Sequence, residues 1–403
     1  MDWSPQQARA LTEIGDWLKS YKTTGKKVFR LFGYAGTGKT TLAKHIADMH
    51  DGRTVFAAFT GKAAHRLREK GCKASTVHSL IYVPKELSRQ GIVDLIAQID
   101  KLKAELPPDE KTSPEIMKLE AKLVQEKRRI KQPSFSINEQ APIYEADLVI
   151  IDECSMIDEK LGFDILSFEK PVLVMGDSFQ LPPVKGSGFF MQENPDIMLE
   201  EIHRQAEESP IIRMSMEIRG GRDIAFTREG DAQRIERSKI DADYALGFEQ
   251  IIVGKNFTRR AINTRVRELK KFEGDFPKAG ERLVCLRNNH EVPLMNGAIY
   301  SVHADSLDDG SYINLDLRSF DGSPILTVAH PEPFMGEEIK EFWFERKKAE
   351  EFDYGYALTC HKSQGSEWDN VLVFNESASF RDKARRWLYT AVTRAAKRVV
   401  LVG

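Results

Sequence analysis

The sequence predicts an α/β protein with two domains built on parallel sheets, a helical hairpin inserted in the first domain and a small β-barrel inserted in the second. Short apolar runs rich in β-branched and aromatic residues occur at 28–32 (VFRLF), 54–59 (TVFAAF), 148–152 (LVIID) and 171–177 (PVLVMGD), and again at 250–254, 371–374 and 398–403. Helical patterns separate several of these runs, such as Leu42, Ile46 and Met49. Strands that alternate with helices form parallel sheets covered on both faces, and two clusters of strands indicate two domains.

Two segments depart from this alternation. Residues 86–131 are charged and contain two apolar stripes with helical spacing, namely Ile92, Leu95, Ile99, Leu102 and Leu106, then Ile116, Leu119, Leu123 and Ile130. The stretch PPDEKTSP at 107–114 separates the stripes, so an antiparallel helical hairpin is predicted. Residues 280–345 contain short strand patterns between the turn signals NNH, NGA, DDG and DGSP, which is typical of a small β-barrel.

The composition indicates a globular chain and leaves its partners open. The 403 residues are 41% hydrophobic and carry a formal net charge of −2. Only the surface that holds phosphates needs to be positive, so this charge neither supports nor excludes nucleic acid. The four cysteines (Cys72, Cys154, Cys285 and Cys360) lack the CxxC spacing of a zinc site and fit a reducing compartment. With neither a signal peptide nor a membrane-spanning run in the sequence, we expect a soluble intracellular protein.

The segment GYAGTGKT at 33–40 is the strongest local signal. It follows a strand pattern, opens a helical pattern and has the form GxxxxGK(S/T) of a phosphate-binding loop. The glycines let backbone amides approach a phosphate, Lys39 reaches the β- and γ-phosphates, and the Thr40 hydroxyl can bind Mg²⁺. A plain glycine-rich turn is the weaker alternative. The residues expected at the nucleotide are Gly33, Gly36, Thr37, Gly38, Lys39, Thr40 and Thr41.

Two adjacent carboxylates end the apolar strand LVIIDE at 148–153. Asp152 would hold Mg²⁺ through water, and Glu153 would act as the general base that activates water. Alone, an Asp-Glu pair after a strand is a weak signal. Together with the loop upstream, it predicts a nucleoside triphosphatase.

Five further segments carry a family resemblance, and they run nearly from end to end: WSPQQ (3–7), GDSFQLPPV (176–184), LEEIHRQ (199–205), ALTCHKSQGSEWDNVLV (357–373) and LYTAVTRAAKRVVLV (388–402). Together they resemble the motifs of superfamily-1 DNA helicases, specifically the RecD/Dda-like branch (superfamily 1B). The resemblance implies two RecA-like P-loop domains and an SH3-like form for the small barrel. Trp3 stands where Leu is usual in that branch.

The resemblance also implies roles at the nucleotide. Gln7 would read adenine, Gln180 would sense the γ-phosphate, and Gly365 and Glu367 would add nucleotide contacts. Arg204 and Arg394 would be arginine fingers supplied by the second domain. Taken alone, each arginine is more simply explained as a surface or helix-end cation, and the VTRA context favours the finger for Arg394.

By the same resemblance, single-stranded DNA would lie across both domains. The residues implied to contact it are Thr60, Lys62, Thr76, His78, Asn256, Arg259, Thr359, His361 and Ser363. Each histidine, taken alone, is better explained as an interior side chain, and two-histidine metal spacing does not occur in the sequence.

The activity implied is ATP- and Mg²⁺-dependent 5′→3′ translocation and duplex unwinding. Expected partners are single-stranded and forked DNA, with replication or recombination proteins as further candidates, and a monomer in the cytoplasm of a bacterial or phage-infected cell is expected. Alternatives are a translocase that does not unwind, a P-loop regulatory ATPase subunit, and an RNA helicase. The expected division is 1–85 with 132–198 (domain 1A), 86–131 (1B), 199–279 with 346–403 (2A), and 280–345 (2B).

The helical segment 86–131 allows two interpretations. In the family it resembles, this interval carries the element that splits the incoming duplex, and a short β-hairpin would be expected there. The segment, or the turn PSFSINEQ that follows it with Phe135, is therefore a candidate separation wedge. A solvated insertion or a partner-docking arm is the alternative.

Overall fold

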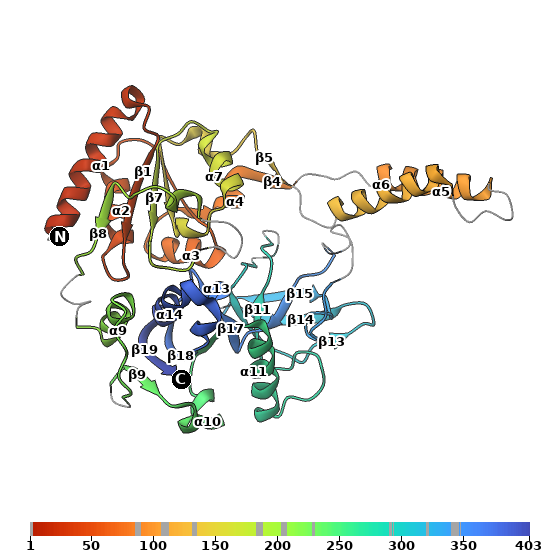
Figure 1. The fold of residues 1–403 in the computed structure, drawn as a ribbon. Helices are drawn as coiled ribbons and strands as arrows, with labels where there is room; N and C mark the ends of the chain where they lie inside the picture. Colours follow the sequence, from red (N-terminus) through yellow and green to blue (C-terminus); the bar gives the residue numbers. More distant parts are fainter. Residues whose placement is uncertain are drawn as a thin grey trace.

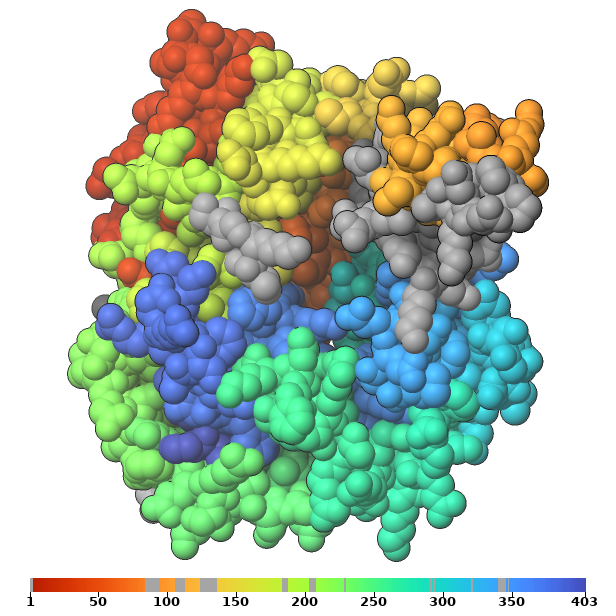
Figure 2. Space-filling view, turned by 45° about the vertical axis from the view of Figure 1, so that its right-hand side comes forward, coloured from red at the N-terminus to blue at the C-terminus, as the bar shows by residue number. Residues whose placement is uncertain are grey.

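The computed structural model describes residues 3–84, 90–105, 113–130, 135–182, 188–202, 208–227, 230–289, 292, 294–319, 322–339, 346 and 348–403. Two parallel sheets, each covered by helices, form two α/β domains, and this part of the predicted fold is confirmed. In Figures 1 and 2 the domain coloured red to yellow-green lies above the domain coloured green to blue.

The first parallel sheet has six strands in the order β3-β2-β6-β7-β1-β8. They are β1 (Val28–Gly33), β2 (Thr54–Ala58), β3 (Ala74–Thr76), β6 (Leu148–Asp152), β7 (Val172–Gly176) and β8 (Ile197–Leu199). The helical elements around it are α1 (Pro5–Thr24), α2 (Lys39–Met49), α3 (Gly61–Glu69), α4 (Val77–Ile81), η1 (Pro142–Glu145), η2 (Cys154–Met156), α7 (Glu159–Leu166) and η3 (Phe189–Met191).

Alternation along each strand divides the core of this domain into two layers. On β6, Leu148 and Ile150 pack with α1, α2 and α3, whereas Val149 and Ile151 pack with α4, η1 and α7. Both faces are therefore apolar, as in other parallel sheets. Polar side chains are left to the loops that follow the strands.

The second parallel sheet has five strands in the order β17-β10-β18-β19-β9. They are β9 (Ala232–Ile235), β10 (Gln250–Val253), β17 (Ala357–Thr359), β18 (Trp368–Phe374) and β19 (Ala395–Val402). The accompanying helical elements are α9 (Pro210–Arg219), η4 (Arg237–Lys239), α10 (Ala242–Leu246), α11 (Asn256–Leu269), α13 (Cys360–Ser363), η5 (Ser377–Lys383) and α14 (Ala384–Val392). One face packs on α9 and α14, and the other packs on α11 and on a third, antiparallel sheet.

The antiparallel sheet pairs β13-β14-β12-β11-β16, and β15 pairs with the other edge of β14. Its strands are β11 (Arg282–Cys285), β12 (Ile299–Val302), β13 (Leu307–Asp308), β14 (Ile313–Arg318), β15 (Pro324–Ala329) and β16 (Phe352–Tyr354). A single bridge between Ala329 and Glu350 joins the end of β15 to the residues before β16. The last strand lies beyond the predicted limit of 280–345, because the chain pairs once more with β11 before it enters β17. Closure of this sheet into a barrel stays a prediction.

The predicted hairpin segment contains α5 (Gln90–Ala104) and α6 (Pro114–Ile130), which project from the body in Figure 1. Leu95, Ile99 and Ile116 are buried, and Lys103 forms an ion pair with Glu120 at 2.7 Å. A two-stranded antiparallel ribbon, β4 (Tyr82–Pro84) with β5 (Phe135–Ile137), lies at the base of this arm. The connection between the helices lies outside the described residues, so the hairpin itself stays a prediction.

Two features are absent from the described residues. None of their helices is both long and apolar enough to cross a membrane. In the same part of the chain, His, Cys, Asp and Glu side chains do not gather in groups of three that could hold a metal ion. The four cysteines are buried and unpaired.

A buried charge cluster supports the junction between the antiparallel sheet and the second domain. Glu281 is fully buried, forms an ion pair with Arg267 at 2.9 Å and accepts a hydrogen bond from the Tyr356 hydroxyl at 3.2 Å. Lys278 and Asp305 form a more exposed pair nearby, at 3.4 Å.

Replacing Glu281 by Ala should lower the free energy of unfolding by about 3–5 kcal/mol, because Arg267 would keep a largely buried charge without its partner. Replacing Asp305 by Ala is the matched control and should have a much smaller effect, since that pair is solvated. Urea unfolding followed by circular dichroism measures both. Equal effects would contradict the structural role of Glu281.

Candidate functional site

The loop between β1 and α2 has the backbone of a phosphate cradle. Gly36 and Gly38 have φ angles of 81° and 77°, which L side chains rarely adopt. At Gly33 a Cβ atom would lie 2.7 Å from Thr37 Oγ1, which is too close. The three glycines are therefore needed for the turn, and it leads directly into the N-terminus of α2.

The loop folds around the side chain of its own lysine. Lys39 Nζ donates to the carbonyl oxygens of Gly33 at 2.7 Å and Tyr34 at 2.8 Å. Phosphate oxygens that replaced these neutral acceptors would give the ammonium group charged partners, which are the stronger ones. The Lys39 side chain is thus held where a nucleotide phosphate would need it.

The predicted metal ligands meet beside the loop. Thr40 Oγ1 lies 3.5 Å from Asp152 Oδ2, at the end of β6. Burial raises the pKa of Asp152, the neighbouring Glu153 raises it further, and Lys39 lowers it. A hydroxyl and a buried carboxylate are hard oxygen donors, so they suit Mg²⁺ and would hold it next to the phosphates.

Glu153 has a strained backbone, with a φ angle of 54°. Its N–H donates to Asp152 Oδ1 at 2.9 Å, which fixes the two carboxylates relative to each other. Non-glycine residues in this region are uncommon and are often held there by their surroundings at functional sites.

Gln180 lies in a turn that follows β7. Its N–H donates to the carbonyl oxygen of Asp177 at 3.2 Å. Its side-chain oxygen is buried and has no hydrogen-bond partner among the described residues. A buried acceptor without a partner is costly, so this amide is suited to a ligand.

Gln7 and Glu367 also come close to the loop. Gln7 Nε2 donates to the carbonyl oxygen of Thr37 at 3.0 Å. Glu367 pairs with Arg66 of α3, and Arg66 contributes to the pKa of Asp152. Gly365 packs against α3, because a Cβ there would lie 2.7 Å from Thr60 Oγ1.

The structure describes only one of the two predicted arginine fingers. Arg204 lies outside the described residues. Arg394 is buried, and its guanidinium donates to the carbonyl oxygens of Thr390 at 3.0 Å and Ser366 at 3.2 Å. In this arrangement Arg394 joins two motifs of its own domain, and its finger role stays a prediction.

Three predicted DNA contacts share one structural position. Thr60, Thr76 and Thr359 each follow a parallel strand and cap a helix, accepting backbone N–H groups of Ala63, Ser79 and Lys362. Each threonine thus caps its helix at, or just after, the carboxyl end of a parallel strand.

The remaining DNA candidates lie in different surroundings. Asn256 is exposed at the start of α11, and Ser363 is fully buried and donates to the carbonyl oxygen of Cys360. The ring of His78 lies 5.9 Å from that of Phe59, and the ring of His361 lies 5.8 Å from that of Phe380. Burial is the main cause that lowers the pKa of both histidines, which favours neutral rings.

Two basic residues predicted to contact DNA have partners within the protein. Lys62 Nζ lies 4.1 Å from the centre of the Trp368 ring in the second domain, and burial lowers its pKa to about 8. Arg259 is buried and pairs with Asp353 at 2.5 Å, which joins α11 to β16. Sequence patterns show a cation but not its partner, and the DNA contacts of both residues stay predictions.

Residues that the sequence analysis did not single out connect the two domains. The N–H of Ala35, in the phosphate loop, donates to the Tyr389 hydroxyl at 3.0 Å, and that hydroxyl donates to Asp177 Oδ2 at 2.6 Å. Arg219 of α9 lies 3.5 Å from the centre of the Tyr34 ring. The only signal for Tyr389 was its place in the segment that contains VTRA.

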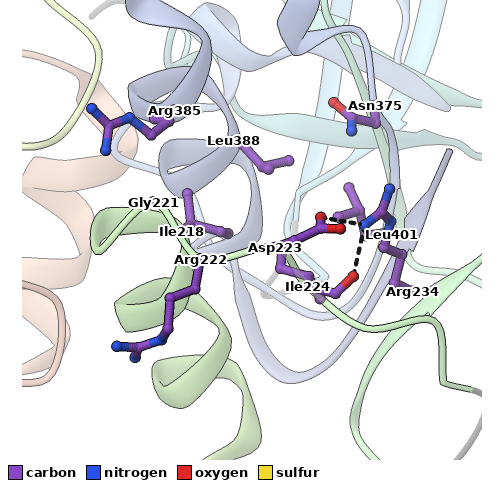
Figure 3. A pocket seen from close by; sticks show the side chains of 10 residues that line it. All are labelled: Ile218, Gly221, Arg222, Asp223, Ile224, Arg234, Asn375, Arg385, Leu388 and Leu401. Carbon is purple, nitrogen blue, oxygen red and sulfur yellow. Dashed lines mark hydrogen bonds and ion pairs between the residues drawn. The ribbon is translucent and has the colours of Figure 1, made fainter.

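A separate pocket of about 250 Å³ lies in the second domain between α9, α14 and β19 (Figure 3). Arg234 is bonded to Asp223 and to the carbonyl oxygen of Ile224, while the guanidinium groups of Arg222 and Arg385 point away from its middle. It contains none of the predicted site residues.

Comparison with known proteins agrees with this geometry. Residues 4–239 match the family model of an AAA domain, and residues 354–402 match that of a UvrD-like helicase C-terminal domain. The chain is 27% identical over 438 residues to the ATP-dependent RecD2 DNA helicase of Deinococcus radiodurans, covering 100% of this chain and 50% of that protein. It is also 50% identical over 48 residues to the RecBCD enzyme subunit RecD of Mycobacterium tuberculosis, covering 12% of this chain and 8% of that protein.

Solved structures show the same fold. Bacteroides Pif1 bound to single-stranded DNA aligns with a TM-score of 0.55 at 18% identity, over 100% of this chain and 92% of that one. Pif1 helicase from Candida albicans aligns with a TM-score of 0.52 at 18% identity, over 100% and 94%.

The extent of these matches decides what they establish. The chain spans about half the length of the RecD2 relative and a smaller share of the RecD subunit. The AAA-domain model, however, matches more than half of the chain. The chain therefore belongs to that AAA-domain family, and its likeness to RecD2 bears out the predicted RecD-like branch of the superfamily-1B helicases.

Proposed function

We propose that the chain is an ATP-dependent DNA helicase that moves 5′→3′ along single-stranded DNA and unwinds duplex. The observation that carries the proposal is the hydrogen bond between the phosphate loop and the second parallel domain, from the N–H of Ala35 to the Tyr389 hydroxyl. Such a contact makes the state of the nucleotide site depend on the distance between the domains. The Deinococcus relative is named an ATP-dependent DNA helicase, and Bacteroides Pif1 was solved with ADP-AlF3 and single-stranded DNA.

At the nucleotide, Lys39 binds the β- and γ-phosphates, and Glu153 takes a proton from the attacking water. Thr40 and Asp152 hold Mg²⁺, which neutralises charge on the phosphates when bound. Gly33, Gly36, Thr37, Gly38 and Thr41 form the rest of the cradle, with Gln7 at the base. Gly365 and Glu367 lie on the flank formed with α3.

Three residues act at the γ-phosphate and couple its hydrolysis to movement of the domains. Gln180 offers its buried amide to the γ-phosphate or to the attacking water. Arg204 and Arg394 come from the second domain and stabilise transition-state charge, which is worth about 10³–10⁵ in rate in other phosphoryl-transfer enzymes. For Arg394 this requires its guanidinium to leave the carbonyl oxygens of Thr390 and Ser366.

The DNA strand runs along the sheet edges marked by the capping threonines Thr60, Thr76 and Thr359, beside His78, His361 and Asn256. Hydroxyls and backbone amides suit a strand that is released in every cycle, because they bind phosphate more weakly than a row of lysines. Lys62 and Ser363 lie behind these DNA-contacting side chains and hold them in position.

The domain division supports this assignment. Domain 1A comprises 1–85 with 132–198, 1B comprises 86–131, and 2A comprises 199–279 with 346–403. Domain 2B comprises 280–345, forms an SH3-like barrel and pairs with one strand, β16, from the segment of 2A that follows it. The helical arm 1B, or Phe135 in the turn after it, acts as the wedge that separates the two strands of the duplex. We propose a monomer that acts on single-stranded and forked DNA alongside replication or recombination proteins.

Replacing Lys39 by Ala should abolish ATP turnover, because the phosphates lose the cation of the loop. Replacing Glu153 by Gln should lower turnover by about 10²–10⁴-fold while nucleotide and DNA binding persist, since an amide cannot accept the proton. Steady-state hydrolysis with and without DNA measures this, and Glu159→Gln on the surface of α7 is the control. Near-normal turnover of Glu153→Gln would remove its assignment as base.

Unwinding should require a 5′ single-stranded tail, and DNA affinity should fall as salt increases because phosphate contacts release counterions. Duplexes with only a 5′ tail, only a 3′ tail or no tail test the polarity, and fluorescence anisotropy at several salt concentrations tests the affinity. Unwinding of the 3′-tailed duplex alone would contradict the assigned polarity. Translocation without unwinding of any duplex would favour a translocase.

Replacing residues 88–130 by a short Gly-Ser linker should reduce duplex unwinding and spare DNA-stimulated ATP hydrolysis, because it removes none of the motor motifs. Phe135→Ala tests the turn, since stacking of an aromatic side chain on a base is worth about 1–3 kcal/mol. Phe163→Ala, an exposed phenylalanine on α7, is the matched control. Full unwinding by both the deletion and Phe135→Ala would favour a docking arm.

A further inference from the structure

Among the side chains of the second domain that bond to the first domain, Tyr389, Thr390 and Gln364 contact the phosphate loop or the segment 177–181. Tyr389 bonds to Ala35 and Asp177, as described above. The N–H of Leu181 donates to Thr390 Oγ1 at 2.9 Å, and Gln364 Nε2 donates to the carbonyl oxygen of Leu181 at 2.8 Å. The turn that carries Gln180 is therefore held at both of its ends by the second domain.

Tyr389 differs from the other two because its hydroxyl contacts two functional segments at once. It accepts from the backbone of the phosphate loop and donates to the carboxylate that starts the Gln180 turn. Both Tyr389 and Asp177 are almost completely buried. Burial raises the pKa of the Tyr389 phenol well above its usual value, so the hydroxyl keeps the proton that it donates.

Asp177 transmits this contact to Gln180. Asp177 Oδ1 accepts the N–H of Phe179 at 2.9 Å, and its carbonyl oxygen accepts the N–H of Gln180 at 3.2 Å. The Phe179 ring meets the Tyr389 ring edge-on, with centroids 5.2 Å apart. A movement of Tyr389 thus pulls on the backbone that orients the Gln180 amide.

Helix α9 of the second domain also contacts the phosphate loop. The guanidinium of Arg219 covers the ring of Tyr34, the residue before Ala35. This contact adds to that of Tyr389, because α9 and α14 pack in the same hydrophobic core of the second domain.

We propose that Tyr389 is a positioning residue for ATP hydrolysis: its hydroxyl ties the phosphate loop and the Gln180 turn to the second domain, so that turnover follows the movement between domains. The inference rests on the proposed function. ATP binding itself depends on contacts within the first domain, whereas the rate depends on the alignment that Tyr389 maintains.

Tyr389→Phe tests this, because it removes the hydroxyl and keeps the ring. The maximal rate of DNA-stimulated hydrolysis should fall about tenfold, as expected for one hydrogen bond to a charged group, while KM for ATP stays within about twofold. Tyr354→Phe is the matched control. It also removes a buried hydroxyl, which donates to the carbonyl oxygen of Asp275 at 2.6 Å, but it lies away from the cleft and should leave the rate unchanged.

A double-variant cycle separates coupling from general damage. In an Asp177→Asn background the loss from Tyr389→Phe should shrink, because a hydrogen bond to a neutral amide is weaker than one to a carboxylate. If the two losses simply multiplied, or if Tyr389→Phe changed only KM or matched Tyr354→Phe, the coupling role would be wrong.

Hydrogen exchange provides a readout that does not require turnover. The amides of residues 33–38 should exchange faster in Tyr389→Phe than in the wild type, and Tyr354→Phe should not change them. Unchanged exchange there would overturn the contact as a docking interaction. A wild-type chain without DNA-stimulated hydrolysis would defeat the proposed function instead, and the exchange result would still decide whether Tyr389 docks the domains.

Discussion

Burial of both faces of two parallel sheets is the constraint on which the rest of the structure depends. Strands such as β6 place alternate residues in two apolar layers, so their faces have no room for polar chemistry. Reactive groups can then lie only where strands end. Because parallel strands end on the same side, Asp152 and Thr76 both align with Ala58 of β2. The first sheet thus brings a predicted metal ligand and a predicted DNA contact to one edge.

The parts that could be predicted from the sequence are those encoded by neighbouring residues. The phosphate loop, the Asp152–Glu153 pair and the alternation of strands and helices depend on short-range spacing, which a sequence shows directly. The partners of Lys62 and Arg259 could not be predicted, because the Trp368 ring and the Asp353 carboxylate lie far from them along the chain. The role of Tyr389 could not be predicted for the same reason, because its two partners are more than 200 residues away along the chain.

Several contacts between the domains are hydrogen bonds, and such contacts suit an interface that must open. A hydrogen bond that is replaced by a bond to water changes stability by only about 0.5–1.5 kcal/mol, whereas separating a large apolar interface costs much more. Such contacts also have strict geometry, so they hold one relative orientation of the domains until they break. Tyr389, Thr390 and Gln364 therefore combine a defined closed position with easy release.

The connection between the antiparallel sheet and the second parallel sheet has a mechanical consequence. Only Gly355 and Tyr356 separate β16 from β17, and a Cβ at Gly355 would collide with Ile299 and with the backbone of Leu283. A link this short and this tightly packed transmits torque without absorbing it. A rotation of β17 therefore turns the antiparallel sheet with it. The outer strands of that sheet are displaced farthest, because they lie farthest from the link.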